Sequence, residues 1–474
     1  MSVRLRLLVA VLAATAVAVG GTVMERQLAP PSPIPVRLSE EVSGAWHCPH
    51  GGGEGWRAWV AVANPSARPT EVRLTTWSGR SPQTAREILQ PGTHRYVEVL
   101  AGQMASATTV EYLGAPTAAG MIVTRPENQG GGVAAESCAE RAGIRWYVPE
   151  GSTRRGETAS LVLHNPFATD AVVDVSLVTG TRVLRPGRLK GIVLVPGRTH
   201  AVDLGRFALG EEALTAAVAA PLGRVVVGGV TTSAGGLRAT VAVPDLSRRW
   251  ILPAAGDHSG ALVVTAPEDR PAPIHARAQT ADTESALIDL ETVAAGTALG
   301  FDEAAREAGV VVQADGRTPF AASRRLVAAP PAPEPEPREQ PKEEKRGGRD
   351  RKRGRREEEE PPPTPEPSDV AATAGALAPG QSWVVLPPVG PGGGSVVVLL
   401  QNPGARPAEV EVTPLGVDGP GEAATVTVRA RTTARIDLPQ PAAALVRARS
   451  GSVVASAAAL GHRSYAVAAG VPLG

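Results

Sequence analysis

A short motif, in which Trp is followed within four residues by Pro, occurs four times along the chain. The copies hold four of the seven tryptophans in the sequence, which marks them as an internal repeat. They are Trp46-His-Cys-Pro49, Trp146-Tyr-Val-Pro149, Trp250-Ile-Leu-Pro253 and Trp383-Val-Val-Leu-Pro387. A chain with this period is expected to fold as a series of similar units.

A second signal lies 16–19 residues after each of these tryptophans, where an apolar run ends in Asn-Pro or its remnant. The copies are Asn64-Pro65, Asn165-Pro166, Ala266-Pro267 and Asn402-Pro403. On both sides of the turn, apolar residues alternate with polar ones, which is the period of a strand with one buried face. Because Asn bonds its own backbone and Pro fixes φ, the step predicts a turn. We therefore expect an antiparallel hairpin in each unit.

Each of the first two units spans about 100 residues, the size of an immunoglobulin-like sandwich of about seven strands. Only 3% of residues are aromatic, whereas Gly (52) and Pro (44) are frequent, which is typical of short strands and many turns. The predicted fold is therefore all-β, with tandem immunoglobulin-like β-sandwich repeats after one N-terminal transmembrane or signal helix. The expected boundaries are repeat 1 at 46–145, repeat 2 at 146–249, a degenerate repeat 3 at 250–329 and repeat 4 at 379–474.

The N-terminal residues 1–26 predict export. Arg4 and Arg6 precede an uncharged run from Leu7 to Met24, and this order sends the following chain outward. The 18 residues of the run lie near the lower limit of about 17–25 for a membrane-spanning helix. Ala16-Val17-Ala18 also fits a peptidase site. Two alternatives stay open: an uncleaved anchor with a stem at 27–45, giving a single-pass membrane protein with an extracytoplasmic bulk, or a secreted protein.

The two cysteines, Cys48 and Cys138, are expected to form a disulfide, because an exported chain with an even cysteine count favours pairing. A rival interpretation is a zinc site at Cys48 with His47 and His50. No second ligand pair accompanies Cys138, so the disulfide is the favoured prediction and no metal is assigned.

Residues 330–378 form a segment rich in Pro and in both charges, through which no apolar face can be drawn. A disordered linker is expected here. Its basic cluster, Arg349 to Arg356, is interpreted either as a contact for an anionic wall polymer or lipid, or as part of a solvated segment neutralised by Glu357 to Glu360.

Motifs of enzymes and cofactor sites are not found in the sequence. It has no Gly-x-Ser-x-Gly elbow, no His-Glu-x-x-His and no phosphate-binding loop, so we assign no catalytic residue and no cofactor. A hydrolase with an unrecognised carboxylate site is the least favoured alternative. His94 and His200 occupy equivalent repeat positions and are interpreted as structural. The net charge of +1, without a basic face, argues against a nucleic-acid partner.

The first unit holds three additional tryptophans: Trp56, Trp59 and Trp77. The alternation places Trp59 and Trp77 on the outward face of the expected hairpin, close enough to form a platform for stacking sugar rings. The alternative is that they pack against a neighbouring domain, because exposed apolar patches usually mark a contact.

The Trp-x-x-Pro opening, the Asn-Pro turn and the Pro91-Gly-Thr93 strand start resemble an uncharacterised actinobacterial family of secreted or membrane-anchored proteins, domain of unknown function 5719. The resemblance implies an envelope-associated protein with no assigned activity and no catalytic residue to carry over.

Together these features predict a non-enzymatic extracytoplasmic scaffold or interaction protein of the cell envelope. Its expected partners are the membrane, through the N-terminal segment, and envelope proteins or cell-wall glycans. The alternative is a carbohydrate-binding accessory protein for cell-surface polysaccharide assembly, with Trp59 and Trp77 as contacts.

Overall fold

The computed structural model describes residues 42–79, 81–234, 236–253, 259–303, 308–327, 369–373, 375–438, 440–460 and 465–473. Their regular structure consists of antiparallel β-strands and three short 3-10 helices, which makes the fold all-β. Within these residues no helix is long and apolar enough to cross a membrane. The N-terminal segment expected at 1–26 lies outside the described residues.

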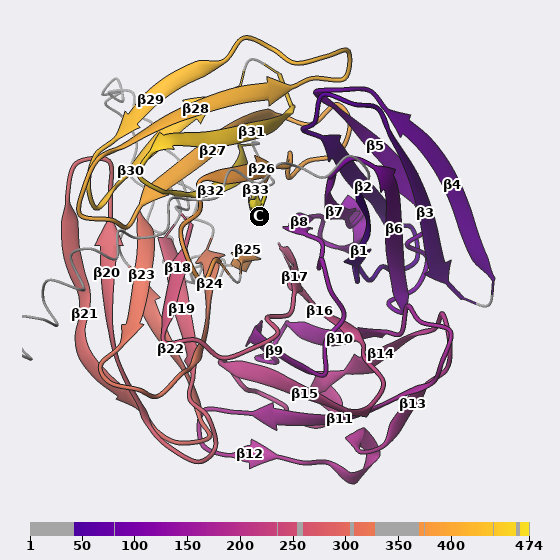
Figure 1. Cartoon of the computed structure of the whole chain (residues 1–474). Coiled ribbons are helices and arrows are strands. Elements are labelled where there is room, and N and C mark those ends of the chain that lie inside the picture. Colours follow the sequence, from indigo (N-terminus) through magenta and orange to yellow (C-terminus); the bar gives the residue numbers. More distant parts are fainter. Residues whose placement is uncertain are drawn as a thin grey trace, which may run out of the picture. The chain divides into compact units, whose positions relative to one another are not determined.

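The strands form four sandwich-like units, each made of two antiparallel sheets and named sandwich 1 to sandwich 4 (Figure 1). Sandwich 1 consists of β1 (Val42–Cys48), β2 (Arg57–Asn64), β3 (Thr70–Ser78), β4 (Pro82–Leu89), β5 (Thr93–Val99), β6 (Ser106–Gly114), β7 (Ala118–Thr124), η1 (Glu127–Gln129) and β8 (Val133–Ser137). Sandwich 2 consists of β9 (Arg145–Gly151), β10 (Thr158–His164), β11 (Ala171–Val178), β12 (Val183–Leu184), η2 (Gly187–Leu189), β13 (Ile192–Leu194), β14 (Thr199–Asp203), η3 (Leu204–Arg206), β15 (Leu214–Leu222), β16 (Val226–Thr232) and β17 (Leu237–Val241).

Sandwiches 3 and 4 follow the same plan. Sandwich 3 consists of β18 (Arg249–Leu252), β19 (Ser259–Thr265), β20 (Ala272–Gln279), β21 (Glu284–Val293), β22 (Ala298–Glu303), β23 (Gly309–Ala314), β24 (Ala321–Val327) and β25 (Asp369–Thr373). Sandwich 4 consists of β26 (Ser382–Val385), β27 (Ser395–Asn402), β28 (Ala408–Leu415), β29 (Ala424–Val428), β30 (Thr432–Asp437), β31 (Ala443–Ser450), β32 (Val454–Leu460), β33 (Tyr465–Ala469) and β34 (Val471–Pro472).

Sheet I of each sandwich contains the strand with the repeat-initial Trp, and sheet II contains the strand that ends at the Asn-Pro step. In sandwich 1, sheet I has the order β1-β6-β3-β4 and sheet II the order β5-β2-β7-β8, and the other sandwiches repeat this arrangement. An immunoglobulin constant domain instead pairs its first strand with its second. The common feature is the packing of two antiparallel sheets, and the strand order differs.

The prediction of a hairpin around the Asn-Pro step is wrong. β2 pairs with β5 and β7, whereas β3 pairs with β4 and β6, so the turn carries the chain from sheet II to sheet I. Asn64 supports this crossing: its Nδ2 donates to the main-chain oxygens of Arg68 (2.7 Å) and Leu89 (3.1 Å), and its Oδ1 accepts from the Ser66 amide. Asn165 and Asn402 make the equivalent bonds. The motif therefore fixes an arch between sheets.

The repeat-initial tryptophans all make the same hydrogen bond. Each indole Nε1–H donates to the main-chain oxygen of the residue just before a sheet II strand of its own sandwich (β7, β16, β24 and β32, respectively), at 2.8–3.0 Å. The acceptors are Thr117, Val225, Phe320 and Val453, respectively. The four indoles are buried at 7% exposure or less, so each indole satisfies its polar atom and ties sheet I to sheet II within the core.

The last strand of sandwich 3 lies beyond the charged segment. β25 pairs with β24, and Ala376 bridges Ile251 of β18, although residues 328–368 between β24 and β25 are outside the described residues. The segment expected as a linker at 330–378 therefore ends within sandwich 3. At the other end of the repeat array, β1 begins at Val42, inside the stem expected at 27–45.

Each sandwich contacts the next through its sheet I, which faces sheet II of the following sandwich. Thr109 of β6 contacts His164 of β10, Thr215 of β15 contacts Thr265 of β19, and Gln279 of β20 contacts Gln401 of β27. The series closes, because His94 of β5 in sandwich 1 bonds to Leu415 of β28 in sandwich 4. The last strands β8, β17, β25 and β33 also contact one another in cyclic order.

The alternation in the sequence predicts strands with one buried face, but some strands are buried on both faces. The contacts between sandwiches explain this difference. β3 alternates as expected, with Val72 and Leu74 buried and Glu71 and Arg73 exposed. β2, β10 and β27 are instead buried on both faces after their first residue, because their outward face lies against the neighbouring sandwich.

Candidate functional site

A polar pocket opens on sheet I of sandwich 3, where β20 alternates between the core and the outward face. Ile274, Ala276 and Ala278 are buried in the core, while His275 is half-buried and Arg277 is exposed on the other face. Period-two alternation thus presents His275, Arg277 and Gln279 on one face of β20.

The strand register brings further polar groups into line with these residues. Arg249 of β18 pairs with Gln313 of β23, and Gln313 pairs in turn with His275. In the next outward row, Val311 pairs with Arg277. Three strands therefore present Arg, Gln and His side by side, above Val311, which is 8% exposed.

Sandwich 4 covers one end of this face. Gln401 Nε2 donates to Gln279 Oε1 at 3.0 Å, and the Thr433 amide donates to the Thr280 oxygen at 2.9 Å. The covering is close at Gly309, where a Cβ atom would lie 2.4 Å from the Gln401 side chain. The pocket begins where this cover ends, and Pro403 and Arg431 form its border.

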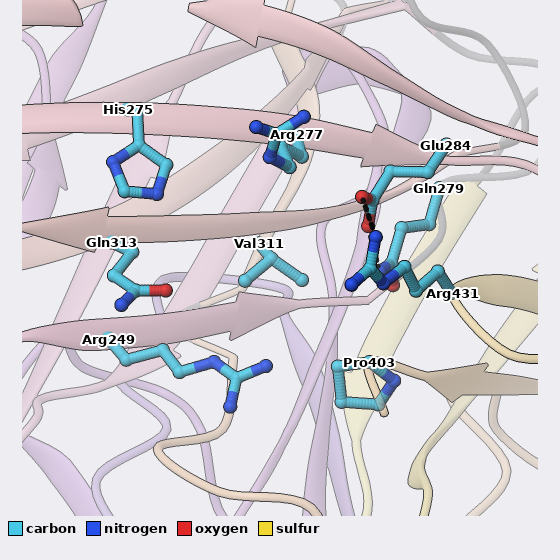
Figure 2. Close-up of a pocket in the computed structure, with 9 residues that line it drawn as sticks. All are labelled: Arg249, His275, Arg277, Gln279, Glu284, Val311, Gln313, Pro403 and Arg431. Carbon is cyan, nitrogen blue, oxygen red and sulfur yellow. Dashed lines mark hydrogen bonds and ion pairs between the residues drawn. The ribbon is translucent and has the colours of Figure 1, made fainter. Parts of the chain in front are cut away.

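The cavity has a volume of about 280 Å³ (Figure 2). Its lining is polar apart from two residues and consists of Arg249, His275, Arg277, Gln279, Glu284, Val311, Gln313, Pro403 and Arg431. Figure 2 shows Arg431 reaching Glu284 from the sandwich 4 side. Three arginines and one glutamate give the lining a formal charge of +2.

The single carboxylate of the pocket is already engaged. Glu284 Oε2 accepts a hydrogen bond from Gln279 Nε2 at 2.8 Å, and Glu284 Oε1 lies 3.7 Å from Arg431 Nη1. Arg249 and Arg277 have no carboxylate partner among the described residues, and the buried Arg249 Nε has no acceptor there. The pocket therefore offers hydrogen-bond donors and positive charge.

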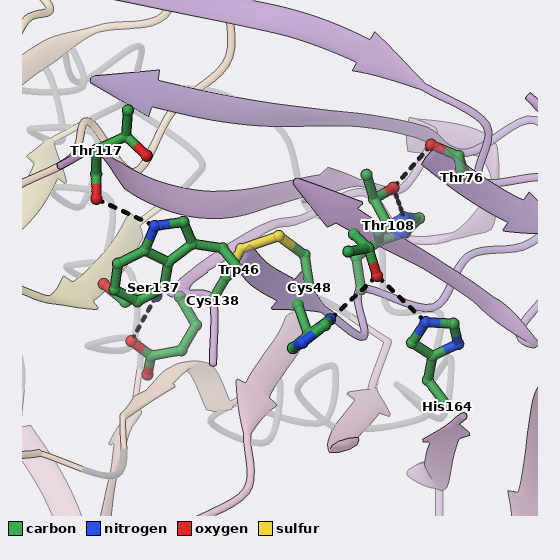
Figure 3. Close-up of a disulfide and its surroundings, with 12 residues drawn as sticks. Trp46, Cys48, Thr76, Thr108, Thr117, Ser137, Cys138 and His164 are labelled. Atoms are coloured by element: carbon green, nitrogen blue, oxygen red, sulfur yellow. Dashed lines mark hydrogen bonds between the residues drawn. A yellow bond between two sulfur atoms is a disulfide. The ribbon is translucent and has the colours of Figure 1, made fainter. Parts of the chain in front are cut away.

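The disulfide expected between Cys48 and Cys138 is present (Figure 3). Both residues are buried, at 0% and 5% exposure, and the bridge joins β1 to the segment after β8. Beside it, the His47 amide and the Ala139 oxygen are 2.8 Å apart. The bridge thus closes the two ends of sandwich 1 on each other, and Cys48 is not a thiolate ligand as the zinc alternative requires.

The two tryptophans expected to form a stacking platform lie on different sheets. Trp59 is on β2 and only 8% exposed; Arg57 stacks on its ring, and Gly390 of sandwich 4 packs against it. Trp77 is on β3 and packs against His164 and Gly197 of sandwich 2, with a ring separation of 4.9 Å from His164. Both indoles therefore pack against neighbouring sandwiches, which was the alternative interpretation, and they do not share one outward platform.

Three buried histidines meet at the contact between sandwiches 1 and 2. His50 Nδ1–H donates to the Gly51 oxygen at 2.7 Å, so its Nε2 accepts from the Thr108 hydroxyl at 3.0 Å. His47 and His164 both contact the Thr109 hydroxyl, at 3.0 and 3.5 Å. Each histidine bonds to hydroxyl groups, and no cluster suited to a metal ion occurs among the described residues.

Burial keeps these three histidines neutral. It lowers the pKa of His47 to about 4 against a partly opposing effect of Glu111, and it lowers the pKa of His50 to about 4. Burial, followed by the charges of His47 and His50, lowers the pKa of His164 to about 3. The junction is therefore built for neutral imidazoles.

The sequence alone did not identify the residues of the basic pocket. The pattern His275-x-Arg277-x-Gln279 places three polar residues on one face of a strand, but solvent-exposed strands commonly show the same pattern. The pocket also needs Arg249 from another strand and Arg431 from another sandwich.

His94 and His200, which occupy equivalent positions in repeats 1 and 2, lie in different environments. His94 is buried and bonds to Leu415, whereas His200 is exposed.

Residues 98–336 match the model of a family described as a family of unknown function, DUF5719. The match covers slightly more than half of the 474 residues and runs from β5 to beyond β24. It includes all lining residues of the basic pocket except Pro403 and Arg431. A search among curated proteins finds no match.

Proposed function

The chain belongs to the DUF5719 family of unknown function, and we propose that it acts as a non-enzymatic extracytoplasmic scaffold or interaction protein of the cell envelope. We also propose that its repeats are immunoglobulin-like in their two-sheet architecture, although their strand order differs. The N-terminal segment 1–26 would hold the chain at the membrane or direct its secretion.

The proposed interaction role is supported mainly by an exposed row of apolar side chains on sandwich 2. Val172 of β11 pairs with Val193 of β13 and with Leu222 of β15, so the three side chains share one outward face. Val193 is 59% exposed and Leu222 is 58% exposed. Exposed apolar side chains that adjoin across three strands are typical of a contact surface.

The equivalent row of sandwich 1 is also apolar at its ends, where Ile88 and Leu113 flank Glu71. Ile88 is 65% exposed and Leu113 is 60% exposed. The same row of sandwich 4 is polar, with Thr427, Glu409 and Ser450 in register. The apolar rows are thus a feature of particular repeats, which supports recognition by a partner protein over a general property of the fold.

The extracytoplasmic location is supported by the buried disulfide, since such bonds persist in oxidising compartments. The scaffold role is supported by the contacts from each sandwich to the next, which also join sandwich 4 to sandwich 1. Four sandwiches held in this way present their outward rows at fixed positions, as a scaffold requires.

The proposal is tested with a photo-crosslinking residue in place of Val193 in the full chain, in intact cells. Thr427, the exposed residue at the equivalent place in sandwich 4, is the matched control position. We expect a discrete product with an envelope protein from position 193, lost when Leu222→Asp is added, and none from position 427. Equal products from both positions, or recovery of the chain in the cytoplasm, would contradict the proposal.

A further inference from the structure

The basic pocket differs from the other outward faces in its balance of charge. On the outward faces of sandwiches 1 and 4, Arg73 pairs with Glu111 at 2.7 Å and Arg449 pairs with Glu411 on neighbouring strands. Each of these pairs balances one positive charge with one negative charge. In the pocket, three arginines share one carboxylate, so two of the three positive charges have no counter-charge in the lining.

Two of these arginines are available to a ligand. Glu284 is engaged by Gln279 and Arg431, and among the described residues neither Arg249 nor Arg277 faces another carboxylate. Arg249 Nε is buried and has no acceptor in the described part of the chain. A buried donor without a partner costs free energy, which is recovered when a ligand oxygen accepts its hydrogen bond.

We propose that this pocket binds one oxyanion group, a phosphate or a carboxylate, carried by a ligand that extends beyond the pocket. Guanidinium groups present donors in a planar fork that matches the oxygens of either group and binds them in a bidentate manner. Arg249 and Arg277 are the principal donors.

The neighbouring residues suit an anion. Gln313 pairs with both Arg249 and His275, so an amide donor lies between the two basic side chains. Val311 lies in the row beside them and is nearly buried, which lowers the local dielectric constant and strengthens charge interactions.

The size of the pocket limits what enters it. A volume of about 280 Å³ lies just below the range of about 300–1,000 Å³ for sites that enclose a whole small molecule. The pocket therefore holds the charged group, and the remainder of the ligand lies over the surface. A phosphate-bearing and a carboxylate-bearing ligand share this chemistry and are separated by experiment.

The test uses the full chain with two probes, inorganic phosphate and glucuronate. Binding of phosphate is followed by broadening of its phosphorus resonance, and binding of glucuronate by saturation transfer from the protein. The variants are Arg249→Met and Arg277→Met, and the control is Arg73→Met, which removes an exposed arginine from the same sheet type in sandwich 1. Thermal unfolding establishes that each variant is folded. Arg277 is exposed, so Arg277→Met carries the test if Arg249→Met does not fold.

We expect at least one probe to bind, with its affinity lowered about tenfold or more by either pocket substitution and unchanged by Arg73→Met. Binding of both probes supports the shared oxyanion chemistry, and binding of one alone identifies its source. Binding of neither probe would overturn the proposal. It would also fail if Arg277→Met and Arg73→Met behaved alike, because binding would then reflect general charge. These results do not depend on the cellular location or on the apolar row.

Discussion

His94 Nδ1 donates a hydrogen bond to the main-chain oxygen of Leu415 at 2.6 Å, which joins sandwich 1 to sandwich 4 across 321 positions of sequence. The His94 amide also donates to the Gly416 oxygen at 3.0 Å. This pair completes the contacts that begin between sandwiches 1 and 2, so no sandwich in the described chain stands at a free end.

The indole hydrogen bond of Trp46 is predicted to stabilise sandwich 1. Trp46→Phe removes the donor to Thr117 and leaves a buried carbonyl unsatisfied, which we expect to lower the free energy of unfolding by about 1–3 kcal/mol. Trp56→Phe is the matched control, because its indole bonds to Gln129 in an exposed position. Thermal unfolding of both variants measures the difference, and equal losses would contradict the role of the buried bond.

The disulfide is predicted to be the main covalent restraint on sandwich 1. It closes a loop of 90 positions, so replacing both cysteines by Ala should lower the free energy of unfolding by about 4–5 kcal/mol. Chemical denaturation of the double variant measures this loss. In the unreduced protein, intact-mass analysis after alkylation should find no thiol adduct, and two adducts only after reduction. Free thiols before reduction would contradict the pairing.

The three buried histidines predict that stability falls in mild acid. Their pKa values in the folded chain, about 3–4, lie below the ordinary value of 6.5, so the unfolded chain binds more protons between these limits. Their contribution is complete above about pH 6.5 and is lost as the pH falls toward 4. The parent chain should therefore be less stable at pH 5 than at pH 7.5.

Replacing one histidine isolates this effect. Between pH 7.5 and pH 5, His164→Gln should remove about 2 kcal/mol of the pH-dependent loss, because a pKa difference of one unit corresponds to about 1.4 kcal/mol. His200→Gln, at an exposed strand position, is the control and should retain the parent profile more closely. The same pH profile in His164→Gln as in the parent would show that the junction does not titrate as described.

The sequence predicted strands and their inward residues well, because alternation depends on local geometry. Val72, Leu74, Val410 and Val412 are all buried as expected. Strand partners could not be predicted in this way. The Asn64 turn bonds its own backbone in the same manner whether the chain continues in one sheet or crosses to the other, and only the pairing of β2 with β5 and β7 decides.

The candidate sites depended even more on tertiary structure. Alternation places Trp59 on the outward face, but it cannot decide between an exposed platform and packing against a neighbour, because the covering residue Gly390 lies more than 300 positions away. The basic pocket needs the register of β18, β20 and β23 together with Arg431 from the next sandwich. By contrast, the Cys48–Cys138 pair was predictable, because the sequence contains two cysteines after an N-terminal segment whose pattern predicts export.

Amide hydrogen exchange at β5 tests most directly whether sandwich 4 closes on sandwich 1. β5 is an edge strand, so every second amide points away from β2 and should exchange quickly unless another group covers it. The contact with Gly416 predicts slow exchange of the His94 amide and faster exchange of the Glu98 amide on the same edge. Equally fast exchange at both amides in the full chain would contradict the closed series of contacts and the scaffold built on it.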